Sequence, residues 1–333
     1  MRFVLRLFLV ALFAGAACAG WLAWFAQSPV PLRESPLAFE VRPGLGLRAA
    51  ATEMAGAGFG FRPWQLSLLG RLTGQANGIK AGSYEVETGI TPRQLLDKLT
   101  RGDVMQAEIV FVEGRTFRQL RAALDADTNV RHDTRGLSDA EILARIGAAE
   151  PHAEGLFFPD TYLFAKQSSD LAILRRAYRA MQRHLTAAWD GRDPALSYAN
   201  PYQALIMASI VEKETGQSAD RPMVASVFAN RLRIGMPLQT DPTVIYGLGE
   251  KFDGNLRKRD LLADGPYNTY TRGGLPPTPI AMPGLASLEA TLRPPATDKL
   301  YFVARGDGSS HFSRSLEEHN RAVAKYQKRG GGR

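Results

Sequence analysis

An apolar run of twenty residues near the N-terminus constrains what this chain can become. Residues 7–26, LFLVALFAGAACAGWLAWFA, carry no charged side chain. Twenty helical residues rise about 30 Å, enough to cross the hydrocarbon core of a bilayer. Arg2 and Arg6 precede the run, and the next charge is Arg33. The positive-inside rule then predicts a cytoplasmic tail at residues 1–6, a single span through the cytoplasmic (inner) membrane, and an extracytoplasmic chain beyond it.

A cleaved signal peptide is the alternative interpretation of the same run. The stretch AGAACAG offers small residues for cleavage, and Cys18 suggests a lipoprotein. The apolar run continues through WLAWFA beyond that stretch, and Trp21 and Trp24 lie where an interfacial aromatic belt is expected. We therefore favour an uncleaved anchor, in which Cys18 is a small apolar residue facing lipid.

The composition is that of a globular protein. Of 333 residues, 45% are hydrophobic and 22% are charged, which excludes a disordered chain and a protein with many membrane spans. A single cysteine excludes an intramolecular disulfide framework and a cysteine-rich zinc module.

The net charge of +8 is a moderate basic excess. It is compatible with attraction to a membrane surface, or with an anionic polymer such as nucleic acid or cell-wall glycan. The basic residues are scattered, no aromatic residues alternate with them, and the domain is expected outside the membrane. We expect no nucleic-acid partner.

No cofactor or metal is expected either. The stretch GLGLRA at 44–49 matches G-x-G-x-x-A, but no alternating strand–helix series follows it, so a glycine turn is the simpler interpretation. The five histidines lack the H-x-x-x-H spacing of a metal-binding helix.

The remaining chain has the pattern of an α+β protein with a small and a larger domain. Residues 27–37 are rich in proline and predict a short tether. Strand, helix, helix and strand are expected at 38–43, 45–59, 62–72 and 81–87, with Leu47, Ala50, Ala51 and Met54 spaced along one helical face. We place the small domain at 38–104, the larger one at 105–328 and a flexible tail at 329–333.

Two glutamates near the end of one predicted helix are candidates for chemistry. The segment YQALIMASIVEKETG at 202–216 is typical of a helix that ends at a glycine. At 100° per residue, Glu214 falls on the apolar stripe of Met207 and Ile210, whereas Glu212 falls roughly opposite. An inward carboxyl should have a raised pKa because burial disfavours its charged form, and a general acid working near neutral pH requires this. The alternative is a glutamate that extends to solvent or pairs with a buried arginine.

Two segments after this helix are rich in glycine, proline, asparagine and tyrosine. They are TDPTVIYGLGE at 240–250 and GPYNTYTRGGLPPTPIAMPG at 265–284. Long loops with several aromatic residues in a compact domain are often binding surfaces. Together they suggest a polar groove for an extended substrate such as a sugar chain.

Several ordered strings resemble the endolytic murein transglycosylase family (MltG), also called YceG-like. They run in the family's order from about Val41 to Tyr326, and they lie at residues 154–162, 208–215, 225–232, 238–247, 267–270, 274–277, 300–304 and 311–312. The resemblance implies a LysM-like subdomain at 38–104 and a catalytic domain at 105–328. It also implies cleavage of the MurNAc–GlcNAc bond in nascent glycan strands to leave 1,6-anhydro ends, which would terminate elongation.

The resemblance aligns the family's catalytic acid with Glu214, and Glu212 is the alternative if the register is shifted. One glutamate suffices when the muramic acid's own 6-hydroxyl attacks, because proximity supplies the nucleophile. Candidates for positioning sugars or orienting the acid are Gln239, Asp241, Asn268 and Tyr270. Asp241 is a possible second carboxylate, although a turn residue before Pro242 is the favoured interpretation.

Two side chains beside these candidates are weaker ones. Tyr267 is expected to pack, and His311 is expected to be structural or to contact the groove.

Two other functions remain open at the level of the sequence. A peptidoglycan-binding scaffold that tethers cell-wall synthases explains the anchor and the small domain, but it does not need an inward carboxyl. A hydrolytic muramidase differs only in the reducing end of its product. In each case the partners expected are glycan strands, the bilayer through residues 7–26, and peptidoglycan synthases.

Overall fold

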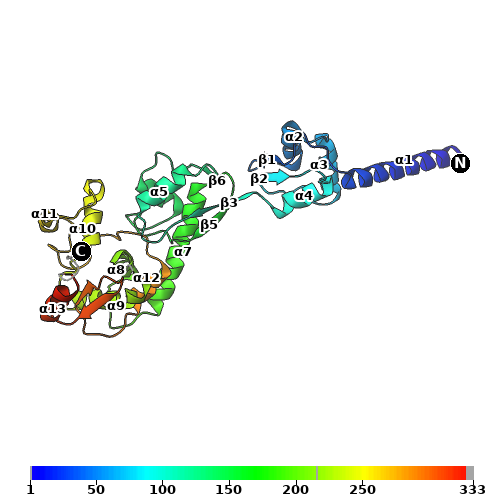
Figure 1. Cartoon of the computed structure of the whole chain (residues 1–333). Coiled ribbons are helices and arrows are strands. Elements are labelled where there is room, and N and C mark those ends of the chain that lie inside the picture. The colour runs from blue at the N-terminus through cyan, green and yellow to red at the C-terminus, as the bar shows by residue number, and fades with distance from the viewer. Residues whose placement is uncertain (1, 215–216, 328–333) are drawn as a thin grey trace. The chain divides into compact units, whose positions relative to one another are not determined.

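The computed structural model describes residues 2–214 and 217–327. The predicted tail at 329–333 and the glycine predicted to follow the catalytic helix, Gly216, lie outside these residues. The chain forms two compact units, whose elements are labelled in Figure 1. Unit 1 contains the chain up to Glu108 together with Asn129–Arg131 and Leu163–Ser168, and unit 2 contains the rest of the described chain.

Unit 1 confirms the predicted strand–helix–helix–strand order. Its elements are α1 (Arg2–Gln27), β1 (Leu37–Val41), α2 (Leu47–Ala57), α3 (Pro63–Leu72), β2 (Gly82–Val86) and α4 (Pro92–Arg101). Strands β1 and β2 pair antiparallel, with Phe39 opposite Tyr84. The predicted inner face of α2 is buried, and the rings of Phe39 and Tyr84 stack with centroids 5.5 Å apart. Apolar burial between two helices and a two-stranded sheet therefore holds this unit together.

Helix α1 is long and apolar enough to cross a membrane, over Phe3–Gln27, which is compatible with a single-pass anchor. Its last residues belong to the core of unit 1. Phe25 and Ala26 are each 8% exposed, and the Trp21 ring stacks on Trp64 of α3 at 5.5 Å.

The segment predicted as a short tether, residues 27–37, is part of unit 1. Val30 is buried and its N–H donates to the Ile90 carbonyl at 2.8 Å. The Gly60 N–H donates to the Pro31 carbonyl at 2.8 Å, and Leu32 forms a single antiparallel bridge with Phe59. Proline-rich composition did not predict these backbone hydrogen bonds, because their partners lie about 30–60 residues further along the chain.

Unit 2 is mainly helical. Its helices are α5 (Phe117–Ala126), α6 (Asp139–Ile146), α7 (Asp170–Asp190), α8 (Pro201–Glu214), α9 (Arg221–Arg233), α10 (Asp241–Leu248), α11 (Lys258–Leu262), α12 (Leu285–Leu292) and α13 (Leu316–Tyr326), with short 3₁₀ turns at Ser218–Asp220 and Gly249–Lys251. Helix α8 contacts α7, α9, α10 and α12, and it is therefore the central element of the unit (Figure 1).

The strands outside β1 and β2 form three further pairs. β3 (Gln106–Val110) pairs with β5 (Thr161–Ala165), β4 (Val130–Arg131) pairs with β6 (Ser168–Ser169), and β7 (Tyr301–Ala304) pairs antiparallel with β8 (Ser310–Ser313). The model is thus a mixed α+β fold, as the sequence predicted.

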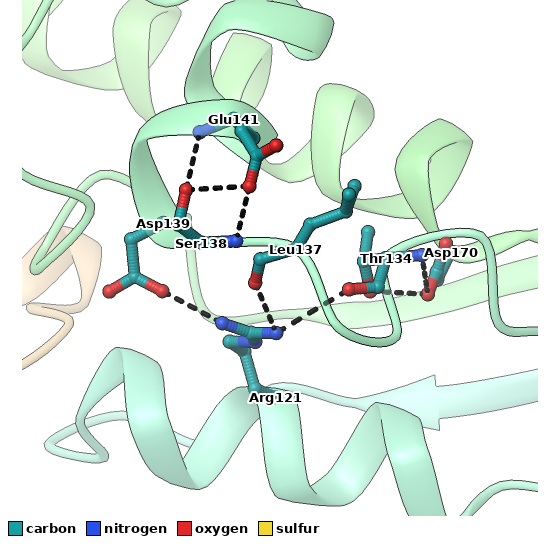
Figure 2. Close-up of polar contacts among 7 residues, drawn as sticks. All are labelled: Arg121, Thr134, Leu137, Ser138, Asp139, Glu141 and Asp170. Atoms are coloured by element: carbon teal, nitrogen blue, oxygen red, sulfur yellow. Dashed lines mark hydrogen bonds and ion pairs between the residues drawn. The ribbon is translucent and has the colours of Figure 1, made fainter.

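Polar contacts fix the helices α5, α6 and α7 of unit 2 to the loops between them. Figure 2 shows Arg121 of α5 bonded to the Leu137 carbonyl at 3.0 Å and to Asp139 at 2.9 Å. A capping box begins α6: the Glu141 N–H donates to the Ser138 hydroxyl, and the Ser138 N–H donates to the Glu141 carboxylate. The fully buried Asp170 accepts from the backbone and hydroxyl of Thr134. A buried carboxylate paired in this way rigidifies its surroundings.

Candidate active site

Glu214 is the last residue of α8, the helix at the centre of unit 2. Residues 204–211 of this helix are all buried. Burial is the largest influence on the Glu214 carboxyl and raises its pKa above the ordinary value. The expected upward shift of the Glu214 pKa is therefore confirmed.

The prediction that Glu212 faces away from the domain is wrong. Its side chain is 8% exposed, and its Oε2 accepts hydrogen bonds from the Gly284 N–H at 3.0 Å and the Ser287 hydroxyl at 2.7 Å. Arg221 lies 4.0 Å from its other oxygen. Because Gly284 precedes the first residue of α12, Glu212 holds the N-terminus of that helix, where a negative charge is favourable. The helical wheel failed because α12 packs against α8 and brings Gly284 and Ser287 to Glu212, a contact that periodicity within α8 does not record.

The carboxyl of Glu214 is held by a threonine. The hydroxyl of Thr240 donates a hydrogen bond to Glu214 Oε1. The N–H of Thr240 in turn donates to the Thr269 hydroxyl at 3.1 Å, and the Thr243 hydroxyl donates to the Thr240 carbonyl at 2.7 Å. All three threonines are at most 2% exposed. This buried network fixes where the Thr240 hydroxyl points, and so it fixes Glu214 Oε1.

Asp241 and Tyr270 form a second polar pair beside Glu214. The Tyr270 hydroxyl donates to Asp241 Oδ1 at 2.5 Å. The negative charge of Asp241 raises the pKa of Glu214, and burial together with Asp241 raises the pKa of the Tyr270 phenol. Asp241 is also the first residue of α10, directly before Pro242. The expectation of a turn at Asp241, within a loop at 240–250, is therefore wrong, because Asp241 begins a helix. Its charge also acts on the candidate acid.

Asn268 supports the loop that carries Tyr270. Its amide donates to the carbonyls of Asp260, Leu261 and Ala263 at 3.3, 3.0 and 2.7 Å. Its Oδ1 accepts from the Tyr270 N–H at 2.9 Å, and the residue is 5% exposed. These bonds engage both ends of the amide within the protein, which favours a positioning role over direct contact with a sugar.

Gln239 differs from Asn268 because it is exposed. Its backbone adopts φ = 49°, in the left-handed region, and its N–H donates to the Thr269 carbonyl at 3.1 Å. A non-glycine residue in this region is uncommon and costs conformational energy. The strained turn aims the chain so that the next residue, Thr240, reaches Glu214.

Arg231 is a further component that sequence reasoning missed. It is 7% exposed on α9, and it donates to the Leu238 and Leu300 carbonyls at 2.7 Å each. Its charge lowers the pKa of Glu214, opposing burial. Its guanidinium carbon lies 5.3 Å from the centre of the Tyr301 ring. One sequence signal could have found Arg231. It lies four residues after the apolar Val227, and residues with this spacing share a helical face, so the pattern indicates an inward arginine.

Thr240 was also missed by sequence reasoning, although it lies between the candidates Gln239 and Asp241.

The two weaker candidates, Tyr267 and His311, contact other side chains of the protein. The Tyr267 hydroxyl bonds Thr278 at 2.9 Å, and His311 on β8 lies against the Tyr326 ring at 5.7 Å. Within residues 2–214 and 217–327, no group of three or more His, Cys, Asp or Glu side chains is arranged to hold a metal ion.

Comparisons with known proteins show the family of this chain. The model of the YceG-like family matches residues 39–325. The chain therefore belongs to the YceG-like family.

Two relatives are named endolytic murein transglycosylase. An endolytic murein transglycosylase of Bacillus subtilis (strain 168) is 35% identical over 268 residues, covering 75% of this chain and 74% of the relative. One from Streptococcus pneumoniae serotype 2 (strain D39 / NCTC 7466) is 27% identical over 282 residues, and the match covers 74% of this chain and 51% of the relative. The chain thus spans about half the length of the pneumococcal relative.

A crystal structure of a yceG-like protein from Listeria monocytogenes, at 2.6 Å, is also similar. It is 29% identical, with a TM-score of 0.54, and the match covers 86% of this chain and 99% of that chain.

Proposed function

We propose that this chain is a lytic murein transglycosylase that cleaves peptidoglycan glycan strands. Membership of the YceG-like family and relatives named endolytic murein transglycosylase support this proposal. The single observation that carries the chemistry is Glu214, a carboxyl with a raised pKa whose Oε1 is held by the buried Thr240. A raised pKa favours the protonated form, which is the form that a general acid needs.

In the proposed reaction, Glu214 serves first as acid and then as base. Because the Thr240 hydroxyl donates to Oε1, the acid form carries its proton on Oε2. That proton passes to the oxygen linking MurNAc to GlcNAc as the bond from that oxygen to MurNAc C1 breaks. The 6-hydroxyl of the same MurNAc then bonds to C1 and its proton returns to Glu214. The products are a 1,6-anhydro-MurNAc end and a free GlcNAc hydroxyl, and the enzyme is regenerated.

Asp241 has a supporting role in this reaction. A glycosidase that uses water or a covalent intermediate needs a second carboxylate at the sugar. Asp241 Oδ1 is instead bonded to Tyr270, which favours an electrostatic role in which the charge of Asp241 raises the pKa of Glu214. An internal hydroxyl as nucleophile removes the need for a second catalytic carboxylate.

The test is mass spectrometry of the products that purified protein makes from uncrosslinked glycan strands. We expect 1,6-anhydro ends from the wild type and a rate about 10²–10⁴-fold lower from Glu214→Gln, which cannot exchange a proton at useful strength. Tyr178→Phe is a control on α7, because Tyr178 bonds Glu150 within unit 2. Reducing MurNAc ends in place of anhydro ends would identify a hydrolytic muramidase. Binding without any cleavage by the wild type would identify a scaffold.

The anchoring of the enzyme is also part of the proposal. Helix α1 would cross the cytoplasmic membrane once, with Arg2 and Arg6 on the cytoplasmic side and both units outside. Residues 38–104 would act as a LysM-like glycan-binding domain, supported by their strand–helix–helix–strand order. Residues 105–328 would form the catalytic domain. Such a position would place the active site beside newly made strands and near peptidoglycan synthases.

A further inference from the structure

Unit 2 contains a second feature that the proposed reaction does not use, a cavity of about 800 Å³. Its wall comes from the start of α5, the loop before Glu154, helix α10 and the loop between α11 and α12. The lining side chains that matter here are Phe117, Glu154, Lys213, Tyr246, Phe252 and Tyr267. Ligand sites typically have volumes of about 300–1,000 Å³, with apolar walls and a few fixed polar groups.

Glu154 is a buried carboxyl in the wall of this cavity. It is 8% exposed; one carboxylate oxygen accepts from the Phe117 N–H at 2.9 Å, and the other accepts from the Tyr246 hydroxyl at 3.1 Å. These two bonds come from the first residue of α5 and from α10. The Gly155 backbone also bonds this carboxylate. Two carboxylate oxygens offer about four acceptor positions, so Glu154 retains the capacity to accept one more hydrogen bond from a ligand.

Aromatic rings form the apolar part of the wall. The rings of Tyr246 and Tyr267 lie with centroids 4.9 Å apart and planes at 63°, and Phe252 is half-buried beside them. Tyrosine offers a large rigid apolar face together with a polar hydroxyl. This mixture suits a saccharide ring, which has C–H groups on its faces and hydroxyls around its edge.

The cavity adjoins the catalytic residues along two separate elements. On α8, Lys213 lines the cavity and Glu214 is the next residue. On α10, Pro242 lines the cavity and Asp241 is the residue before it. A glycan strand with its scissile bond at Glu214 would therefore extend into the cavity by its neighbouring sugars.

We propose that this cavity is a saccharide subsite, in which Glu154 and Tyr246 hydrogen-bond one sugar of the strand and the aromatic wall packs against its ring. The proposal rests on the proposed function, because it assumes that glycan strands are the substrate. Glu154 and Tyr246 are then residues for substrate binding, distinct from the acid Glu214.

The test measures binding of peptide-free glycan strands to the full chain carrying Glu214→Gln, which prevents turnover. In that background, Glu154→Gln and Tyr246→Phe should each weaken binding about tenfold, the effect of losing one hydrogen bond between protein and ligand. In the otherwise wild-type enzyme the same changes should raise KM with kcat changed less than about twofold.

Matched controls come from a second tyrosine–glutamate pair in unit 2. The Tyr178 hydroxyl donates to Glu150 at 2.9 Å, and neither residue lines the cavity. Tyr178→Phe and Glu150→Gln should leave binding unchanged. If both cavity variants have a Tm well below that of these controls, binding by Phe252→Ala is measured instead, because Phe252 is only half-buried. A Kd for Phe252→Ala equal to that of the Glu214→Gln chain would overturn the proposal.

The outcomes separate this proposal from the proposed function. Failure of wild type to cleave, together with failure of the Glu214→Gln chain to bind strands, would overturn the proposed function. Normal cleavage with unchanged binding by the cavity variants would overturn the subsite alone. A loss of affinity seen only with strands that carry peptides would assign the cavity to the peptide and would also overturn the saccharide proposal.

Discussion

The hydroxyl of Thr240 donates to Oε1 of Glu214, although 26 residues separate them in the sequence. The bond joins the end of α8 to the residue before α10, and the buried threonine network keeps the hydroxyl in place. A hydrogen bond to the carboxylate lowers the pKa of Glu214, whereas burial and Asp241 raise it. The acid is thus tuned by opposing influences from two adjacent residues.

The pH dependence of activity should move in opposite directions when these two residues are changed. Asp241→Asn removes a negative charge that raises the pKa of Glu214, so the loss of activity at high pH should begin at a lower pH. Thr240→Val removes a bond that lowers this pKa, so the same limb should move to higher pH. The dependence of kcat/KM on pH measures both shifts. Thr240→Ser is the control, because it keeps the hydroxyl. Shifts of the same sign would contradict this electrostatic account.

Glu212 should matter for stability because of its bonds to α12. Glu212→Ala leaves the Gly284 N–H and the Ser287 hydroxyl without their carboxylate acceptor, and we expect a loss of about 1–3 kcal/mol in the free energy of unfolding. Glu212→Gln should lose less, because its amide oxygen still accepts. Glu289→Ala is the surface control, since that side chain is 50% exposed, and it should change stability by less than about 0.5 kcal/mol. Equal unfolding midpoints in urea for the Glu212→Ala and Glu289→Ala variants would refute the structural role.

Glu154 should make the folded protein less stable as the pH rises. Burial raises its pKa from 4.5 to about 7, so between these values the folded state binds a proton that the unfolded state has released. The free energy of unfolding therefore falls with rising pH across this window, by up to about 3 kcal/mol. Glu154→Gln should flatten the dependence, and urea unfolding at a series of pH values from 5 to 8 measures it. A slope identical to that of wild type would show that Glu154 does not contribute.

Gly155 is required both by its backbone conformation and by a close approach. It has φ = +77°, and a Cβ there would lie 2.4 Å from the Pro279 Cβ. Gly136 has φ = +80° but has no heavy atom within 4 Å of an added Cβ. Both alanine variants incur the backbone strain, of about 1 kcal/mol. Gly155→Ala should lose a further 1–3 kcal/mol, about the cost of overpacking, and thermal unfolding of both variants tests the difference.

The anchor and the fold of unit 1 should be separable at Ala19. Packing of α1 against unit 1 involves Trp21 and the residues after it, so a chain lacking residues 1–19 should leave the membrane fraction and remain folded. In that shortened chain, Trp21→Ala should cost about 0.5–1.5 kcal/mol by loss of its stack on Trp64. Trp24→Ala is the control, because Trp24 is 66% exposed. A mature wild-type protein that begins after Ala19, or that carries lipid on Cys18, would show that the anchor is not retained.

Local sequence determined the secondary structure of unit 1 and the helix that carries the acid. The spacing of Leu47, Ala50, Ala51 and Met54 predicted the buried face of α2, because neighbouring residues on a helix share a face whatever surrounds them. Caps at Thr91, Thr116 and Ser138 were equally local, since a cap hydrogen bond spans only three residues. Glu214 was placed on the inner stripe by the same reasoning.

Only the tertiary structure decided what lies around each side chain. The wheel treated α8 as a surface helix, but helices from both sides of it in the sequence enclose it and bring Gly284 and Ser287 to Glu212. Segments far apart in the chain likewise bring Thr240 to Glu214 and Tyr246 to Glu154, across 26 and 92 residues. Periodicity records which way a residue points on its own element. The groups that it meets, and therefore its pKa and its role, depend on how the elements pack.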